Sequence, residues 1–552
     1  MKLNKFFIAA FAAAAVLSSC GEQAVDDANP DANKAKEGIP TYASFKFFVT
    51  GASRAALSPD NGEVAVPALS RVDILIFKNT GSFVCEKKIS LTGAQAVVDP
   101  QPVLVTSGTK KIFIICNAPT SAQTKLTSIT ENLTTLSEFM ATTSEIDLIP
   151  ASNDLSVLSS YHPSNMPLSN AIDEASTFIL EPSVSANEAE TANPSNQSTH
   201  PSGKNSFNIK VKRMLAKVQV LHNTATVVSG GQIVAVDGAG TAAELRNLAY
   251  TVRNVRRSGY LLMQRRAGTE TPAYDPAIDD PKSVLVPYDA ATSALIPGTI
   301  TQQYSALAQY FFSQSCDATD ATKSYDYLTT LPGGTLPLTN PVPGPFYYVT
   351  ENVNLTPRWG NTTLAVVRAT YLPKAGKYVT SCGYDMVNDA FSPVTGTSDI
   401  TTATTLYKTL KGGPGLPAGS LFTNVTEAYR AGFSLLYPGE KYDNPGSSAL
   451  WTAFQAADAA GIALRAQVLE EYNQGTCYYQ VFFGRGKVAD NSLKYGVIRN
   501  GAYTAMINKF NGIGTSTEDG SNPPVTPLTQ ETYVDVTIII QGWDYVEGQY
   551  EL

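Results

Sequence analysis

The sequence predicts a mainly β fold built from two β-sandwich domains, with long loops and a few short helices. Tyr (27 residues), Gly (40) and Pro (33) are plentiful, a composition that suits strands joined by many turns. Apolar runs, some alternating with polar residues and some continuous, end at turn residues. Only 16% of the residues are charged while 43% are hydrophobic, which excludes a globally disordered chain.

The length sets the domain organisation. A chain of 552 residues is long enough for two large domains, each with a core of its own. We expect a signal segment over 1–20, a tether and leader over 21–54, an N-terminal sandwich over 55–265 and a C-terminal sandwich over 266–552, both of transthyretin-like or Greek-key type. A polar stretch at 270–281 lies near the expected junction.

Strand patterns recur along the whole chain, and helical patterns are few. Strands are predicted over 42–49, 71–78, 111–116, 206–222, 363–371, 478–483 and 533–540. Leu133, Leu136, Phe139 and Met140 have helical spacing, and 449–472 is a second helical candidate with Leu450, Trp451 and Phe454 on one face.

The N-terminus has the pattern of an export signal. Lys2 and Lys5 precede an apolar run over 6–17, which has signal-peptide length and is too short to span a bilayer. The run closes with Leu17-Ser18-Ser19-Cys20, which resembles a bacterial lipobox whose cysteine receives a lipid. We therefore expect an exported protein tethered through Cys20.

The strand at 42–49 is a candidate for removal. One of its faces is apolar throughout and carries Ala43, Phe45, Phe47 and Val49. Burial of each of the three large side chains is worth about 1.5–3 kcal/mol. A small-residue loop follows with a lone basic residue, Arg54, before Ala55. A cut between these two residues would remove the strand with its lipid anchor and leave an apolar groove with unpaired strand edges.

The last predicted strand is a candidate to fill such a groove in a neighbouring subunit. Val534, Val536, Ile538 and Ile540 alternate with other residues, and Trp543, Tyr545 and Leu552 follow. A head-to-tail contact of this kind propagates into a filament. Two plainer interpretations stay open: Arg54 is an ordinary loop cation, and the last strand pairs only within its own domain. Arg71 is a rival cut site, but it opens an apolar strand.

Several motifs, taken in order, resemble those of the Bacteroidales fimbrillins, the type V pilins, and most of all the minor (Mfa-type) shaft subunit. They occupy 71–77, 111–119, 166–169, 213–218, 348–352, 360–369 and 495–500. The resemblance implies a precursor lipid-anchored at the outer membrane through Cys20. It also implies cleavage at Arg54–Ala55 by an arginine-specific protease, loss of 42–49, and polymerisation by strand exchange with 533–552 as the donor.

The same resemblance implies the partners. They are further copies of this chain, accessory tip and anchor subunits, the protease, and receptors on host or bacterial surfaces. The resulting cell-surface fimbria supports adhesion and biofilm formation. The alternatives are a non-polymerising tip or anchor protein, a glycan-binding surface lipoprotein that would expose an aromatic platform, and a cell-surface hydrolase that would need a clustered acid pair.

Signals for other chemistry are weak, and we expect no enzyme, no cofactor and no metal. The three histidines, His162, His200 and His222, are predicted to be surface imidazoles. The glycine-rich stretches at 412–415 and 484–486 lack a Walker lysine. The acidic doublets at 26–27, 279–280 and 470–471, two of which sit in evident loops, are interpreted as solvated charge. A net charge of −8 argues against nucleic acid as a partner. The five cysteines after Cys20 are odd in number and lack metal-ligand spacing; Cys116 is predicted to be a buried strand thiol.

Overall fold

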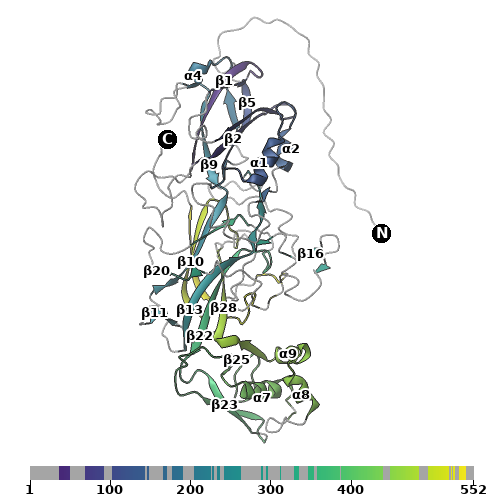
Figure 1. Cartoon of the computed structure of the whole chain (residues 1–552), viewed down its shortest axis with the longest axis vertical. Coiled ribbons are helices and arrows are strands. Elements are labelled where there is room, and N and C mark those ends of the chain that lie inside the picture. Colours follow the sequence, from purple (N-terminus) through teal and green to yellow (C-terminus); the bar gives the residue numbers. More distant parts are fainter. Residues whose placement is uncertain are drawn as a thin grey trace, which may run out of the picture.

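The structure is a computed structural model of the chain, and it is mainly β, as predicted (Figure 1). It describes residues 36–49, 69–92, 102–142, 146–147, 166–170, 177–190, 204–224, 227–228, 233–235, 242–262, 288–289, 294–295, 307, 311–312, 329–334, 346–352, 357–385, 387–438, 440, 448–483, 495–520, 522, 524, 526–528 and 534–542.

The N-terminal part contains an eight-stranded sheet at one end of the molecule (Figure 1). Its strand order is β3 (Cys85–Thr92), β2 (Arg71–Lys78), β5 (Gly108–Cys116), β7 (Leu168–Ser169), β9 (Ser206–Arg213), β1 (Pro40–Val49) and β4 (Val103–Thr106), with β8 (Thr177–Leu180) paired to β5. Three helices accompany this sheet: α1 (Thr120–Thr127), α2 (Leu136–Thr142) and α4 (Ala186–Glu190). The predicted strand at 71–78 is confirmed to the residue.

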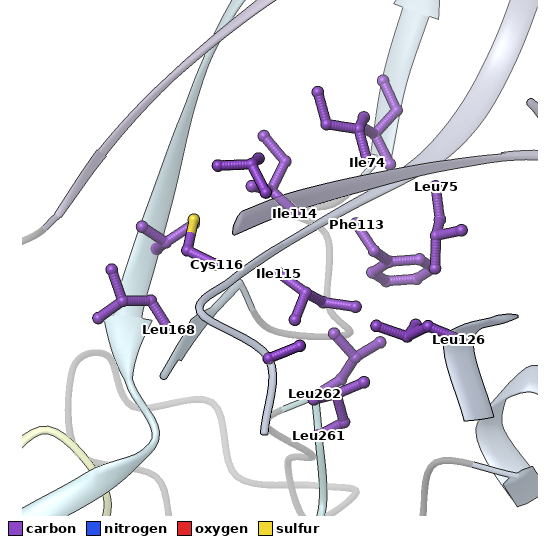
Figure 2. Close-up of a cluster of buried hydrophobic side chains, with 14 of the residues drawn as sticks. Ile74, Leu75, Phe113, Ile114, Ile115, Cys116, Leu126, Leu168, Leu261 and Leu262 are labelled. Carbon is purple, nitrogen blue, oxygen red and sulfur yellow. The ribbon is translucent and has the colours of Figure 1, made fainter. Parts of the chain in front are cut away.

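A cluster that we call the first core fills this part of the molecule. Because β2 and β5 are central strands, they bury both of their faces and read as continuous apolar runs. Figure 2 shows Ile74 and Leu75 of β2 with Phe113 and Ile115 of β5. Leu261 and Leu262, from a much later part of the chain, join the same cluster (Figure 2).

Two further sheets share the second core, which lies in the middle of the molecule (Figure 1). One has the order β20 (Gly333–Gly334), β10 (Leu215–Asn223), β29 (Gly501–Phe510) and β30 (Val534–Gly542), with β21 (Tyr347–Thr350) on β10. The other has the order β11 (Val227–Val228), β12 (Ile233–Ala235), β13 (Ala243–Arg253), β22 (Leu364–Pro373) and β28 (Thr476–Phe482), with β19 (Thr329–Thr330) on β13. The predicted sandwich and Greek-key details stay predictions.

A segment that we call the insert, residues 379–472, separates β22 from β28 in sequence although these two strands are hydrogen-bonded neighbours. It lies at the end of the molecule opposite the first core (Figure 1). Its sheet has the order β24 (Ala390–Thr395), β23 (Val379–Asp385), β26 (Leu421–Phe422), β25 (Leu406–Thr409) and β27 (Leu469–Tyr472), and its helices are α7 (Val425–Leu436), α8 (Ala449–Gln455) and α9 (Ala459–Arg465).

Short elements complete the described part of the chain. The two-stranded pairs are β14 (Val255–Arg256) with β18 (Phe311–Phe312), β15 (Ser258–Gly259) with β6 (Ile146–Asp147), and β16 (Tyr288–Asp289) with β17 (Ala294–Leu295). A 3-10 turn, η8 (Asn473–Gly475), connects β27 to β28. No helix in the described ranges is both long and apolar enough to cross a membrane.

The structure corrects the helical prediction at 449–472. Two short helices and a strand replace the single helix, because Ala456 has an extended backbone (ψ 138°) and the Asp458 side chain caps α9 by accepting a hydrogen bond from Gly461 N (2.8 Å). Trp451 and Phe454 are buried as predicted, but Leu450 is 42% exposed. In the other helical prediction, Leu133 is 72% exposed and precedes α2.

The predicted strand at 206–222 is two strands, β9 and β10, separated by Met214. Met214 N donates to Pro167 O (2.9 Å) and leaves the ladder, and its side chain is buried in the first core. The chain passes here from the first sheet to the second. The predicted domain boundary near residue 265 stays a prediction.

The cysteines that the structure describes are packing residues. Cys85, Cys116, Cys382 and Cys477 are buried free thiols, so the prediction for Cys116 is confirmed. Burial raises the pKa of Cys85 and that of Cys382 to about 11, so both stay protonated near neutral pH. Cys316 lies outside the described residues.

Candidate functional site

The predicted removable strand, β1, lies inside the first sheet and pairs on both sides. Pro40 to Ala43 pair antiparallel with Thr106 to Val103 of β4. Ser44 to Val49 pair parallel with Ser206 to Val211 of β9. Loss of β1 would therefore expose two strand edges at once, each with unpaired backbone groups that another extended segment can satisfy.

One face of β1 belongs to the first core. Ala43 and Phe45 are fully buried, as the alternation predicts, and the Phe45 ring stacks on Phe207 of β9 at a centroid distance of 6.2 Å. Phe207 in turn contacts Phe178 of β8 at 5.1 Å. For Phe47 and Val49 the structure describes the main chain, which pairs with Ile209 and Val211.

Hydrogen bonds of buried polar side chains also hold β1, and the sequence did not reveal them. Thr41 Oγ1 donates to Glu181 O (2.7 Å) and Ser44 Oγ donates to Ala189 O (2.6 Å). Asn205 Nδ2 donates to Thr41 Oγ1 (3.0 Å) and to Tyr42 O (3.1 Å). Since these partners lie 140 or more residues from β1 in sequence, no local pattern reports them.

Helix α4, which receives the Ser44 hydrogen bond, is fixed by a capping box. Glu188 accepts hydrogen bonds from the backbone and hydroxyl of Ser185 (2.9 and 2.8 Å) and from Lys204 Nζ (3.1 Å). These bonds lower the pKa of Glu188 to about 2. The Ser-x-x-Glu spacing at 185–188 is the sequence signal that predicts this cap.

The cut-site and lipid-site residues Arg54, Ala55 and Cys20 lie outside the described residues. The rival cut site, Arg71, lies in the described part of the chain and belongs to a paired strand. It is the first residue of β2, paired with Thr92 of β3, and Arg71 Nε and Nη2 donate to the two carboxylate oxygens of Asp73 (2.6 and 2.9 Å). Asp73 itself is 1% exposed.

We therefore predict that an arginine-specific protease leaves the Arg71–Val72 bond of the native protein intact. A protease must bind the chain in extended form, and here β2 is already paired on both sides. Mass spectrometry of a native digest should show no fragment that starts at Val72, whereas the same digest after denaturation should show one. A Val72 N-terminus in the native digest would contradict the prediction.

The predicted donor strand is present as β30, and in this chain it pairs within its own sheet. Its residues 534–542 run antiparallel to β29, from Phe510↔Val534 to Gly501↔Gly542. The strand terminates the order β20-β10-β29-β30, so it is an edge strand among the described elements. Val536 packs against the second core. The side chains of Val534, Ile538 and Ile540, and all of Trp543, Tyr545 and Leu552, lie outside the described residues.

The carboxyl end of β30 lies close to the junction between the two cores. Gly542 is opposite Gly501, the next residue, Ala502, pairs with Lys217 of β10, and Asn500 N donates to Leu215 O (2.9 Å). Leu215 is part of the first core. The carboxyl end of β30 therefore lies beside the first core, and the donor assignment stays a prediction.

A buried ion pair closes the same junction. Arg499 Nε lies 2.8 Å from Glu351 Oε2, and the two side chains are 2% and 8% exposed. Arg499 Nη2 also donates to Tyr260 O (2.8 Å), next to Leu261 of the first core. Nearby, Asn352 Nδ2 donates to Thr363 Oγ1 (2.9 Å).

Four of the motifs singled out in the sequence meet in this network: 213–218, 348–352, 360–369 and 495–500. Asn500 Oδ1 accepts from Arg213 N (3.3 Å), and Asn352 pairs with Val497 through a β-bridge. These four motifs, which are far apart in the sequence, therefore share one structural role: they join the two cores.

Features that suggested other chemistry have structural roles where they are described. His222 is 8% exposed, which corrects the expected surface position, and burial lowers its pKa. Glu470 is paired with Lys408 Nζ at 2.9 Å and accepts from Tyr472 (2.8 Å) and Ser516 N (2.9 Å). Within the described ranges, no group of three or more His, Cys, Asp or Glu residues has the geometry to hold a metal ion.

Both ends of the chain match models of fimbrial protein families. Residues 43–209, from β1 into β9, match the major fimbrial subunit protein (FimA) family, and 470–548, which include β28 to β30, match the C-terminal part of the type IV major fimbrial subunit protein, fimbrillin. These two matches confirm the predicted resemblance to the fimbrillins. A search of curated proteins found no match.

Solved structures similar to this protein include a fimbrilin (fimA) from Porphyromonas gingivalis W83, which is 14% identical, with 92% of this chain and 98% of that chain covered and a TM-score of 0.39. The tip fimbrial protein Mfa3 from Porphyromonas gingivalis is 11% identical, with 90% and 97% covered and a TM-score of 0.30. A fimbrial assembly protein from Parabacteroides distasonis ATCC 8503 is 10% identical, with 64% and 100% covered and a TM-score of 0.22. With such TM-scores, these matches add no weight to the family matches. The family matches support a fimbrial subunit at the cell surface.

Proposed function

We propose that this protein is a structural shaft subunit of a cell-surface fimbria, of the Mfa-type. It is exported as a lipoprotein precursor tethered through Cys20, and an arginine-specific protease hydrolyses the Arg54–Ala55 bond. Loss of the leader, residues 1–54, opens a groove between β4 and β9. The C-terminal segment of the next subunit enters this groove, and the repeated contact builds a head-to-tail polymer that supports adhesion and biofilm formation.

The observation that carries the proposal is the position of β1. It is the strand nearest the N-terminus that the structure describes, yet it lies between β9 and β4 and buries Ala43 and Phe45 in the first core. Such a strand is joined to the rest of the sheet by one covalent connection, which leads through Arg54. After one cut in this connection, β1 is held in the sheet by non-covalent contacts alone, and another extended segment can replace it.

The donor end has matching properties. The strand β30 holds an edge position in its own sheet, its carboxyl end lies at the junction, and residues 543–552 follow it in sequence. These residues include Trp543 and Tyr545, whose rings are large enough to fill apolar positions vacated by Phe45.

The test is maturation in vitro. The precursor is digested with an arginine-specific protease under native conditions, and we expect a product that starts at Ala55 and forms ladders on mildly denaturing gels. A variant that ends at Gly542 keeps β30 and should keep the fold by circular dichroism but form no ladders. Arg54→Ala should stay uncut at this site and monomeric, while the matched control Arg71→Ala should mature like the wild type.

The other outcomes separate the alternatives. Ladders formed by the variant that ends at Gly542 would contradict a donor role for residues 543–552. A correctly cut protein that never polymerises would contradict the shaft role and favour a tip or anchor subunit. A mature N-terminus other than Ala55 would contradict the cut site.

A further inference from the structure

The segment just before β1 is bound by a turn of the first sheet, between β4 and β5. Ser107 is fully buried and makes four hydrogen bonds to this segment. Its Oγ donates to Lys36 O (2.5 Å) and accepts from Ile39 N (3.1 Å). Its backbone N donates to Ile39 O (2.7 Å), and its O accepts from Gly38 N (3.2 Å).

The first two residues of β5, Gly108 and Thr109, surround the side chain of Glu37. Thr109 N donates to Glu37 Oε1 (2.9 Å). Gly108 has a φ of +102°, which side chains disfavour, and an added Cβ would lie 2.1 Å from Glu37 Cδ. Glycine therefore leaves the space that the carboxylate fills. Gly38 has a φ of +86°, so the bound segment also depends on a glycine at that position.

We propose that Ser107, Gly108 and Thr109 form a peptide-binding site that extends the pairing of β1 with β4 toward the N-terminus and adds side-chain contacts to it. Its ligand is a segment that has an acidic side chain followed by a glycine with positive φ, supplied in the precursor by Lys36 to Ile39. We call this site the latch. The proposal rests on the proposed function only in that residues 1–54 are taken to be the part removed.

Because of the latch, cleavage of the leader and its release from the groove are two separate steps. A cut after Arg54 frees the carboxyl end of the leader but breaks none of the contacts made by 36–49, since all of them lie before the cut. The buried Ser107 groups would lose their partners if the leader left without a replacement, and an unpaired buried polar group is costly. The cut leader therefore stays bound until another segment displaces it, which protects the groove from non-specific pairing.

The first test uses the uncut precursor, so it depends neither on proteolysis nor on polymerisation. Hydrogen exchange is measured at the amides of Gly38 and Ile39. Because Ser107→Ala removes two of the hydrogen bonds and leaves Ile39 N without its acceptor, we expect exchange about tenfold faster there. Ser434→Ala changes a serine that is also buried, but in α7, and should leave the rates of these amides unchanged.

The second test follows the leader after cleavage. In the wild type, the fragment 1–54 should co-elute with the body on size exclusion, and Ser107→Ala should lose it about tenfold faster. Gly108→Ala should act in the same direction because the added Cβ displaces the Glu37 carboxylate. Gly419→Ala is its matched control, with a φ of +85° and no atom near the added Cβ.

Different results would contradict the latch and the proposed function. Unchanged exchange in Ser107→Ala, or Gly108→Ala releasing the leader no faster than Gly419→Ala does, would overturn the latch even if the protein polymerises. Absent ladders combined with faster exchange would leave the latch in place and count against the shaft role alone.

Discussion

Phe45→Ala should lower the free energy of unfolding of the first core by about 3–5 kcal/mol in the precursor. The Phe45 ring is fully buried, stacks on Phe207 and belongs to a strand held on both sides, so truncation leaves a cavity that the paired backbones cannot close. Denaturant unfolding monitored by fluorescence or circular dichroism measures the change. Once the leader is removed, wild-type and variant bodies have the same sequence, so the difference should vanish.

Phe83→Ala is the matched control for this experiment. Phe83 lies in the connection between β2 and β3 and is 40% exposed, so the same truncation should cost less than about 1 kcal/mol. Equal unfolding curves for Phe45→Ala and Phe83→Ala would contradict the burial of β1 in the precursor. A difference that persists after loss of the leader would mean that 42–49 remains with the mature protein.

Arg499→Ala should destabilise the protein by about 3–5 kcal/mol, because it leaves the Glu351 carboxylate buried without its partner. It also removes the hydrogen bond to Tyr260 O. The double variant Arg499→Met with Glu351→Met should recover most of the loss, since replacement of both charges by apolar side chains avoids an unpaired buried charge. Thermal and denaturant unfolding report both effects.

Lys204→Ala is the control for the ion pair. It breaks a pair with Glu188 in which the two side chains are 60% and 43% exposed, and exposed pairs contribute about 0–1 kcal/mol. Arg499→Ala should therefore be clearly less stable than Lys204→Ala. Equal stability of the two variants would show that the junction does not depend on the buried pair.

The strands were predictable where burial imposes a pattern along the chain. The run at 71–78 is apolar on both faces because β2 is central, and its bounds agree with the prediction. The break at Met214 was not predictable, because the apolar pattern continues through it although the chain changes sheet. Likewise, the helix at 449–472 is interrupted by a cap at Asp458 that competes with the helical spacing.

For the same reason, the sequence predicted the apolar face of β1 in the candidate site. Alternation revealed the core face of β1, with Ala43 and Phe45, since that face is apolar. It did not reveal the polar contacts, because Thr41, Ser44 and Asn205 find their partners through tertiary contacts. The junction motifs were noticed, but the pairing of Glu351 with Arg499 joins residues 148 positions apart, a distance that no local spacing can report.

The passage at Met214 has a mechanical consequence for a pilus. The strand that borders β1 and the strand that leads to β29 and β30 are separated by that single residue. In the proposed fibre, force applied to the segment bound in the groove would therefore be transmitted through the continuous backbone at Met214. It would reach the sheet that contains β30, the strand before the donor segment. The side-chain contacts at Arg499 and Asn500 would then resist rotation of the two cores relative to each other, while covalent bonds of the backbone carry the tensile force.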